Sequence, residues 1–205
     1  MAVGLFYRNY AVHLGNDMEE TSYLTVRNAE ECSDVFENPA NAIYAYQNPR
    51  DNNGFTVSRS ALHFDTSALP DSIVISEVKI RLNIVVATNK VCVIQSGMPD
   101  YPHNPAVAGD FFHEHYSGSE EFGPFDTGNR YVYLSEDNFS WINTTGDTKL
   151  LFRVKTDVTG DEPSGIERGL WAYNDAAHKP YIMITYEEAA AYDYPIYPVI
   201  FPLRT

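Results

Sequence analysis

The sequence predicts an all-β fold, and three observations lead to that prediction. Residues 78–86 alternate between apolar and polar side chains, which is typical of a strand with one buried face. The 205 residues include 15 Tyr, 11 Phe, 12 Gly and 12 Pro, a composition that favours strands joined by turns. No stretch shows the apolar spacing of a long helix. A hydrophobic content of 44% is enough for a sizeable core.

We expect one domain of eight or nine strands over residues 1–186. Apolar, β-branched and aromatic residues between turn formers predict strands at 23–27, 42–46, 60–64, 78–86, 91–95, 130–134, 149–154, 169–173 and 181–186. Residues 1–20 are predicted to form an aromatic start and then an acidic loop at 16–20, residues 97–128 to be rich in loops, and residues 138–143 to form one helical turn. A two-sheet antiparallel jelly-roll sandwich with long loops accommodates these strands and hides most of their edges.

The strand pattern also predicts which side chains form the core. The residues expected between the sheets are Leu62, Phe64, Val78, Ile80, Leu82, Ile84, Phe152 and Ile184. Lys79 and Arg81 should then face solvent or a partner. Cys92 lies in an apolar run and is expected to be a small buried residue, and whether it pairs with Cys32 stays open.

The charge of the chain limits its partners. With 28 acidic and 14 basic residues, the formal net charge is −14, which repels nucleic-acid phosphates and anionic membrane surfaces. No run of 18 apolar residues and no signal-peptide pattern occurs, so we expect synthesis in a cytoplasm and no transmembrane helix.

Two clusters could hold a metal ion. In the segment His113-Glu114-His115, a strand would place both histidines on one face, although a polar loop explains the segment equally simply. A structural calcium ion is the one cofactor considered, and the oxygen ligands suggested for it are Asp65, Asp71, Asp157, Asp161 and Glu162. Solvated turns are the alternative for these acids, and we expect no other cofactor.

Aromatic residues offer a different kind of site. Trp141, Trp171 and Tyr173, with Tyr101 and Tyr116, are candidates for a sugar-stacking platform, and core packing is the alternative. An exposed aromatic row on one sheet face would favour sugar binding. No nucleophile elbow, glycine-rich phosphate loop or triad spacing is present, so we do not expect an enzyme.

Residues 187–205 are expected to form a linker and an extended arm. Three prolines fix the backbone and remove hydrogen-bond donors. The candidate partner-docking residues are Tyr192, Tyr194, Pro195, Tyr197, Pro198 and Phe201. An arm of this composition is expected to dock on its own domain or on another subunit.

Residues 59–70, 75–82 and 179–186 carry a family resemblance. These segments resemble the jelly-roll domains called DNRLRE or carbohydrate-binding-module-like domains. A closer similarity is to uncharacterised proteins of phage and prophage structural regions, which share strands like 23–27 and Arg59-Ser60 and a segment like 106–111. The likeness spans roughly residues 20–186 and covers neither the first 20 residues nor the arm.

This resemblance implies a binding or structural module. The first expectation is a non-enzymatic virion protein of the capsid surface or the tail, which contacts other virion proteins and forms a homo-oligomer. The alternative is a carbohydrate-binding module, which on a virion would bind a host-surface glycan. A third reading is an accessory domain of a lyase or glycosidase. Head or tail location, host and oligomeric state stay open.

Overall fold

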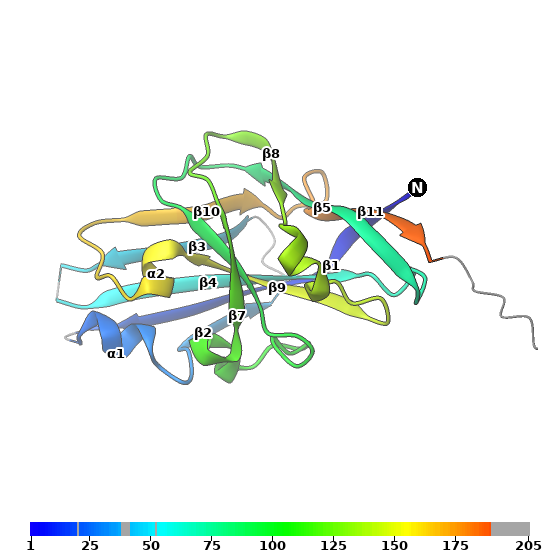
Figure 1. Cartoon of the computed structure of the whole chain (residues 1–205). Coiled ribbons are helices and arrows are strands. Elements are labelled where there is room, and N and C mark those ends of the chain that lie inside the picture. Colours follow the sequence, from blue (N-terminus) through cyan, green and yellow to red (C-terminus); the bar gives the residue numbers. More distant parts are fainter. Residues whose placement is uncertain (20, 38–41, 52, 190–205) are drawn as a thin grey trace, which may run out of the picture.

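The protein consists largely of antiparallel strands, with a few short helical segments (Figure 1). The computed structural model describes residues 1–19, 21–37, 42–51 and 53–189. The strands are β1 (Ala2–Met18), β2 (Asp34–Glu37), β3 (Ala42–Pro49), β4 (Phe55–Asp65), β5 (Ile73–Ile84), β6 (Cys92–Ser96), β7 (Ser117–Phe122), β8 (Gly128–Tyr133), β9 (Asp147–Val154), β10 (Glu167–Tyr173) and β11 (Tyr181–Glu188). The helical segments are α1 (Tyr23–Arg27), α2 (Lys155–Thr159) and the 3-10 turns η1 (Ala108–Phe111), η2 (His113–His115) and η3 (Glu136–Trp141). The all-β prediction is confirmed.

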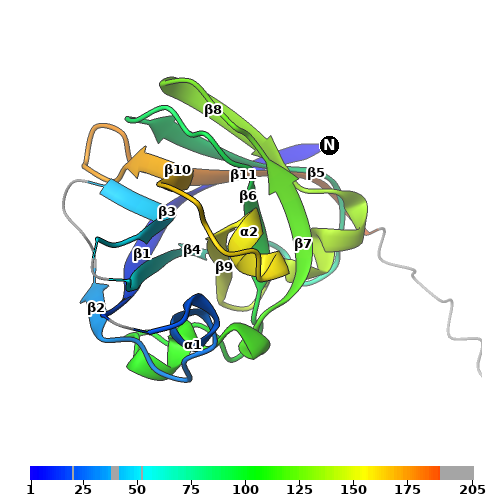
Figure 2. The ribbon, with the colours of Figure 1, turned by 90° about the vertical axis from the view of Figure 1, so that its left-hand side faces the viewer.

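The strands form one sheet that curls back on itself (Figure 2). Their order is β2-β1-β11-β5-β10-β3-β4-β9-β6-β7, with β8 paired to β5. An additional pairing of β1 with β4 produces a barrel-like closure. The long strand β1 makes this possible, because its first part pairs with β11 and its second part with β4. A register shift between Arg8 and Tyr10 separates the two parts, as a β-bulge that bends a strand does.

The main core fills the space enclosed by the sheet. Every residue predicted for it is at most 1% exposed, from Leu62 and Phe64 to Phe152 and Ile184, so the predicted core is confirmed. Lys79 and Arg81 lie on the opposite face of β5 and are partly exposed, as predicted.

A second core covers the other face of β1 and β4. Val12, Leu14 and Val57 from these strands pack with Tyr23 of α1 and Phe111 of η1. Strand β4 is therefore buried on both faces along almost its whole length. Its sequence lacks clear alternation for that reason, and only residues 60–64 were predicted as strand.

The structure differs from four secondary-structure predictions. Residues 23–27 form helix α1, whose first turn is capped by the Ser22 hydroxyl accepting from the Thr25 amide. Residues 1–20 hold the long strand β1, which extends into the loop predicted at 16–20, and the loop-rich region 97–128 contains two 3-10 turns and strand β7. Glu187 and Glu188 belong to β11 and not to a linker.

Gly169 allows β10 to cross close to two other strands. A Cβ atom at this position would lie 3.2 Å from the Cα of Cys92 and 3.3 Å from the Cα of Val154. The same residue lies within a register shift between Arg168 and Leu170. Arg168 and Trp171 therefore both pair with the outward-facing positions of β3.

Candidate functional site

A row of aromatic side chains covers the outer face of β3 and β10. Tyr44 lies opposite Trp171, and Tyr46 lies opposite Arg168. The alternating neighbours Ile43 and Ala45 are fully buried in the main core, so the two tyrosines must point outward. Tyr44, Tyr46 and Trp171 are half-buried, which leaves part of each ring accessible.

These rings continue into β1 and β2. We call the set Phe36, His13, Tyr44, Tyr46 and Trp171 the tryptophan platform. The ring centroids of Tyr44 and Trp171 lie 5.3 Å apart, and those of Tyr46 and Trp171 lie 6.1 Å apart with an interplanar angle of 29°. His13 lies 4.2 Å from Tyr44 and 5.9 Å from Phe36. Five rings from four strands are thus in contact. His13 is only 5% exposed and connects Phe36 with Tyr44, and the other four rings are at least partly exposed.

Polar groups lie along the same surface. Ser58 is paired with Tyr46 across β3 and β4, which places both side chains on one face. The Ser58 hydroxyl and the Arg168 Nε are buried and lack a hydrogen-bond partner within the described part of the chain. Burial lowers the pKa of His13 to about 4, so this ring is neutral at pH 7. The platform therefore combines partly exposed aromatic rings with the partly exposed Arg168 at its margin.

The structure divides the predicted sugar-stacking residues. Trp171 belongs to the platform, and Tyr173 lies two residues further along the same face, where its ring stacks on His178 at 4.9 Å. Trp141 and Tyr116 are buried in the two cores, so the idea that they form a surface platform was wrong. Tyr101 stacks on His115 at 3.8 Å, next to the second core.

A second aromatic surface covers β1, β11, β5 and β8, which lie side by side (Figure 1). We call it the tyrosine face. Its outward residues are Val3, Leu5, Tyr7, Tyr181, Met183, Lys79, Arg81, Tyr131 and Tyr133. Leu5, Tyr7 and Tyr133 are between 45% and 55% exposed.

Side chains on the tyrosine face contact one another across the strands. Tyr7 and Tyr181 meet edge to face at 5.5 Å, and the hydroxyls of Tyr181 and Tyr131 lie 3.2 Å apart. The guanidinium of Arg81 lies 5.7 Å from the Tyr181 ring, and the Lys79 ammonium lies 5.7 Å from the Tyr133 ring. The Lys79 ammonium also lies 2.9 Å from the carboxylate of Glu77 on the same face. The face thus combines apolar area with the Arg81 cation and a Lys79–Glu77 ion pair.

The predicted metal ligands do not come together. His113 and His115 lie in η2 and not on a strand, with His113 hydrogen-bonded to Asn28 and His115 stacked on Tyr101. Across the described residues, no group of three or more His, Cys, Asp or Glu side chains is close enough to hold a metal ion. Four of the acids suggested for calcium, Asp65, Asp71, Asp161 and Glu162, belong to no such group.

Asp157, also suggested as a calcium ligand, is instead the centre of a buried ion cluster. Arg59 Nε and Nη2 donate to its two carboxylate oxygens at 2.8 Å each. Arg153 Nε and Nη2 donate to the same oxygens at 2.8 and 3.0 Å. Burial alone would raise the pKa of Asp157, but the two guanidinium groups outweigh it and lower the pKa. The cluster joins β4, β9 and α2 and is structural.

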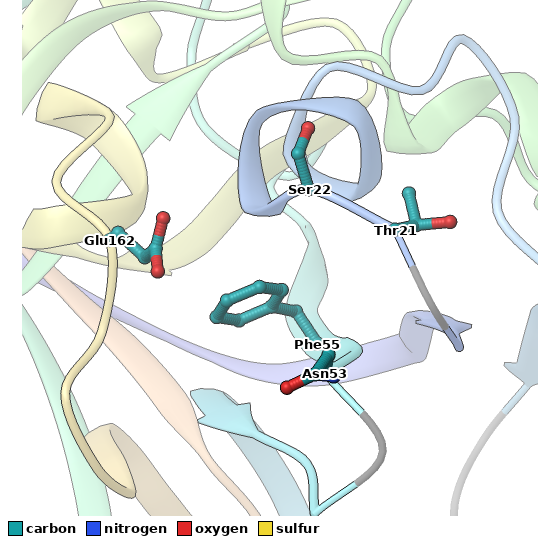
Figure 3. Close-up of a pocket in the computed structure, with 5 residues that line it drawn as sticks. All are labelled: Thr21, Ser22, Asn53, Phe55 and Glu162. Carbon is teal, nitrogen blue, oxygen red and sulfur yellow. The ribbon is translucent and has the colours of Figure 1, made fainter.

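An open hollow of about 500 Å³ lies beside α1 (Figure 3). Thr21, Ser22, Asn53, Phe55 and Glu162 line it. The Ser22 hydroxyl is engaged in capping α1, and no histidine lines the hollow. These residues do not provide a nucleophile with an adjacent base. A smaller hollow is lined by Glu30, Glu31, Gly109, Phe112 and His115.

Sequence reasoning missed Tyr44, Tyr46, Tyr7, Tyr131 and Tyr133 as surface residues. Each of them alternates with buried residues in a predicted strand or, for Tyr7, in β1. Aromatic residues at the outward positions of these strands were therefore the sequence signal that could have predicted the two surfaces. The six docking residues proposed in the arm lie outside the described residues.

No protein-family model matches this sequence, and no curated protein matches it significantly.

The two cysteines, Cys32 and Cys92, are both buried and unpaired with each other. No helix among the described residues is long and apolar enough to cross a membrane.

Proposed function

We propose that this protein is a non-catalytic carbohydrate-binding protein, with the tryptophan platform as its sugar site. One observation carries the proposal, namely the group of three partly exposed rings, Tyr44, Tyr46 and Trp171, that contact one another on the outer face of β3 and β10. The C–H face of a pyranose ring is apolar and slightly positive, so it is attracted to the negative face of an aromatic ring. Several coplanar or tilted rings in a row suit successive units of a chain.

The margin of the platform supports the same function. Arg168 lies opposite Tyr46 and is only partly buried, so its guanidinium can donate to a sugar hydroxyl at this margin. The formal net charge of −14 disfavours acidic polysaccharides, which the surface would repel. We therefore propose a neutral glycan as the ligand.

Binding can be tested through tryptophan fluorescence, because the chain has only two tryptophans and Trp141 is buried. A neutral oligosaccharide that stacks on Trp171 should change its emission. Isothermal titration calorimetry, which needs no fluorescent reporter, should show that Trp171→Ala weakens binding at least about tenfold, as loss of a central aromatic anchor does. Phe112→Ala removes another half-buried ring distant in sequence from the platform and should leave the affinity unchanged. Equal binding by Trp171→Ala and the wild type would refute the proposal.

A second proposal places the protein in a phage particle, as a capsid-surface or tail component that contacts other virion proteins. The resemblance of residues 20–186 to phage structural-region proteins motivates it, and the exposed tyrosine face favours it, because soluble monomers rarely expose such contiguous apolar area. A two-sheet jelly-roll arrangement is the finer architecture that we propose, supported by the crossing of β10 over β6 and β9 at Gly169. Detection of the chain in purified particles by mass spectrometry tests this placement.

A further inference from the structure

We propose that the tyrosine face binds the C-terminal segment 190–205 of a second copy of this chain. This inference goes beyond sugar binding and uses other strands, so either proposal can fail while the other stands. It rests on three properties of the described surface and of the sequence that follows it.

The first property is the chemistry of the face. It presents accessible rings of Tyr7, Tyr131 and Tyr133 beside Leu5, with Arg81 and Lys79 between them. Proline-rich segments bind to surfaces lined by aromatic rings, because the extended proline backbone is preformed and loses little entropy on binding.

The second property is the composition of the segment. Residues 192–205, with the sequence YDYPIYPVIFPLRT, contain three prolines, three tyrosines, one phenylalanine and four aliphatic residues. Asp193 carries the charge opposite to that of Arg81 on the face. An extended segment of this length spans up to about 43 Å at 3.1 Å per residue, more than the roughly 23 Å from Val74 to Arg81 along β5.

The third property is the place where the described chain ends. The Ala189 amide donates to the Ser72 carbonyl at 2.9 Å, beside the start of β5. Strand β11 runs from the tyrosine face toward the start of β5. The chain therefore moves away from the tyrosine face as it reaches Ala189. Binding to its own face would need a reversal near Ala189, Ala190 and Ala191, a stretch without the Gly, Asn or Pro that favours tight turns. A neighbouring copy needs no such reversal.

The arrangement is heterologous, since a segment of one copy meets a face of the next, and it builds rings or open chains. Sedimentation velocity of the full chain should show concentration-dependent oligomers. Leu5→Glu, on the face, should convert them to a 23.1 kDa monomer. Leu24→Glu, a matched change at an exposed leucine of α1, should leave them intact.

A synthetic peptide of residues 190–205 provides the second arm of the experiment. An excess should disperse the wild-type oligomers, whereas a peptide with the same residues in scrambled order should not. Circular dichroism of Leu5→Glu checks that the variant is folded, and Tyr133→Ala serves as the alternative if it is not. A wild-type chain that stays monomeric at all concentrations overturns the proposal. So do oligomers that neither the face variants nor the peptide affect.

Discussion

At the scale of single residues, two buried histidines, His13 and His63, make the stability of the fold depend on pH. Both rings are at most 5% exposed, and the two ring nitrogens of His63 have no hydrogen-bond partner within the described residues. Burial lowers the pKa of each ring from 6.5 to about 4. Nearby Lys149 lowers the pKa of His63 further, whereas Asp110 opposes this shift.

The unfolded chain therefore binds protons between pH 6.5 and 4 that the folded chain does not. The stability contributed by neutral His63 is fully present above pH 6.5 and is lost as the pH falls toward 4. Between pH 7 and pH 4.5 this loss should be about 2 kcal/mol for each histidine. Urea unfolding of wild type and His63→Leu over this range should show a shallower decline in the variant. At pH 8 His63 is neutral in both the folded and the unfolded chain, so the difference between wild type and variant measures packing alone. If the free energy of unfolding falls equally with pH in both proteins, His63 is not the source of the decline.

At the scale of secondary-structure elements, the Asp157 cluster ties both α-helices to the sheet. Arg59 of β4 and Arg153 of β9 bind Asp157 of α2, and Arg59 Nη2 also donates to the Arg27 carbonyl of α1. The Arg59 guanidinium lies 3.9 Å above the Phe111 ring, so η1 joins the same assembly. Short helices such as these depend on tertiary contacts rather than on their own length.

Asp157→Asn should destabilise the protein by about 3–5 kcal/mol, because it leaves two buried guanidinium groups without their charge partner. Asp161→Asn is the matched control at an exposed acid just beyond α2 and should change the free energy of unfolding by less than about 0.5 kcal/mol. Urea denaturation monitored by circular dichroism gives both values. A loss below about 1 kcal/mol for Asp157→Asn would mean that water replaces the carboxylate.

The elements also show what the sequence could and could not reveal. Strand β5 was predictable because its apolar and polar residues alternate over one buried face. Helix α1 was not, because Tyr23 and Val26 favour strands, and only their burial three residues apart in the second core makes them helical. Trp171 could be named as a candidate, but its meeting with Tyr44 depends on a cross-strand register that no local pattern encodes.

For the molecule as a whole, the closed sheet explains how one small fold can present two surfaces of different composition. The inward-facing side chains of the strands form the main core. The outward-facing side chains differ in chemistry from one group of strands to another. Partly exposed rings with Arg168 at their margin lie on β3 and β10, whereas tyrosines with aliphatic and charged residues lie on β1, β11, β5 and β8. The first composition suits a sugar and the second a peptide.

The last prediction concerns the independence of the fold from its C-terminal segment. Both cores are built from residues up to Ile184, and the last described strand ends at Glu188. A chain ending at Ala189 should therefore keep its fold, with a free energy of unfolding within about 0.5 kcal/mol of the full chain when both are compared as monomers. Leu5→Glu in the full chain provides the monomeric reference. Thermal unfolding at low protein concentration measures the difference. A sharply lower Tm for the shortened chain would instead mean that residues 190–205 pack on their own domain, and it would remove the main support for exchange between copies.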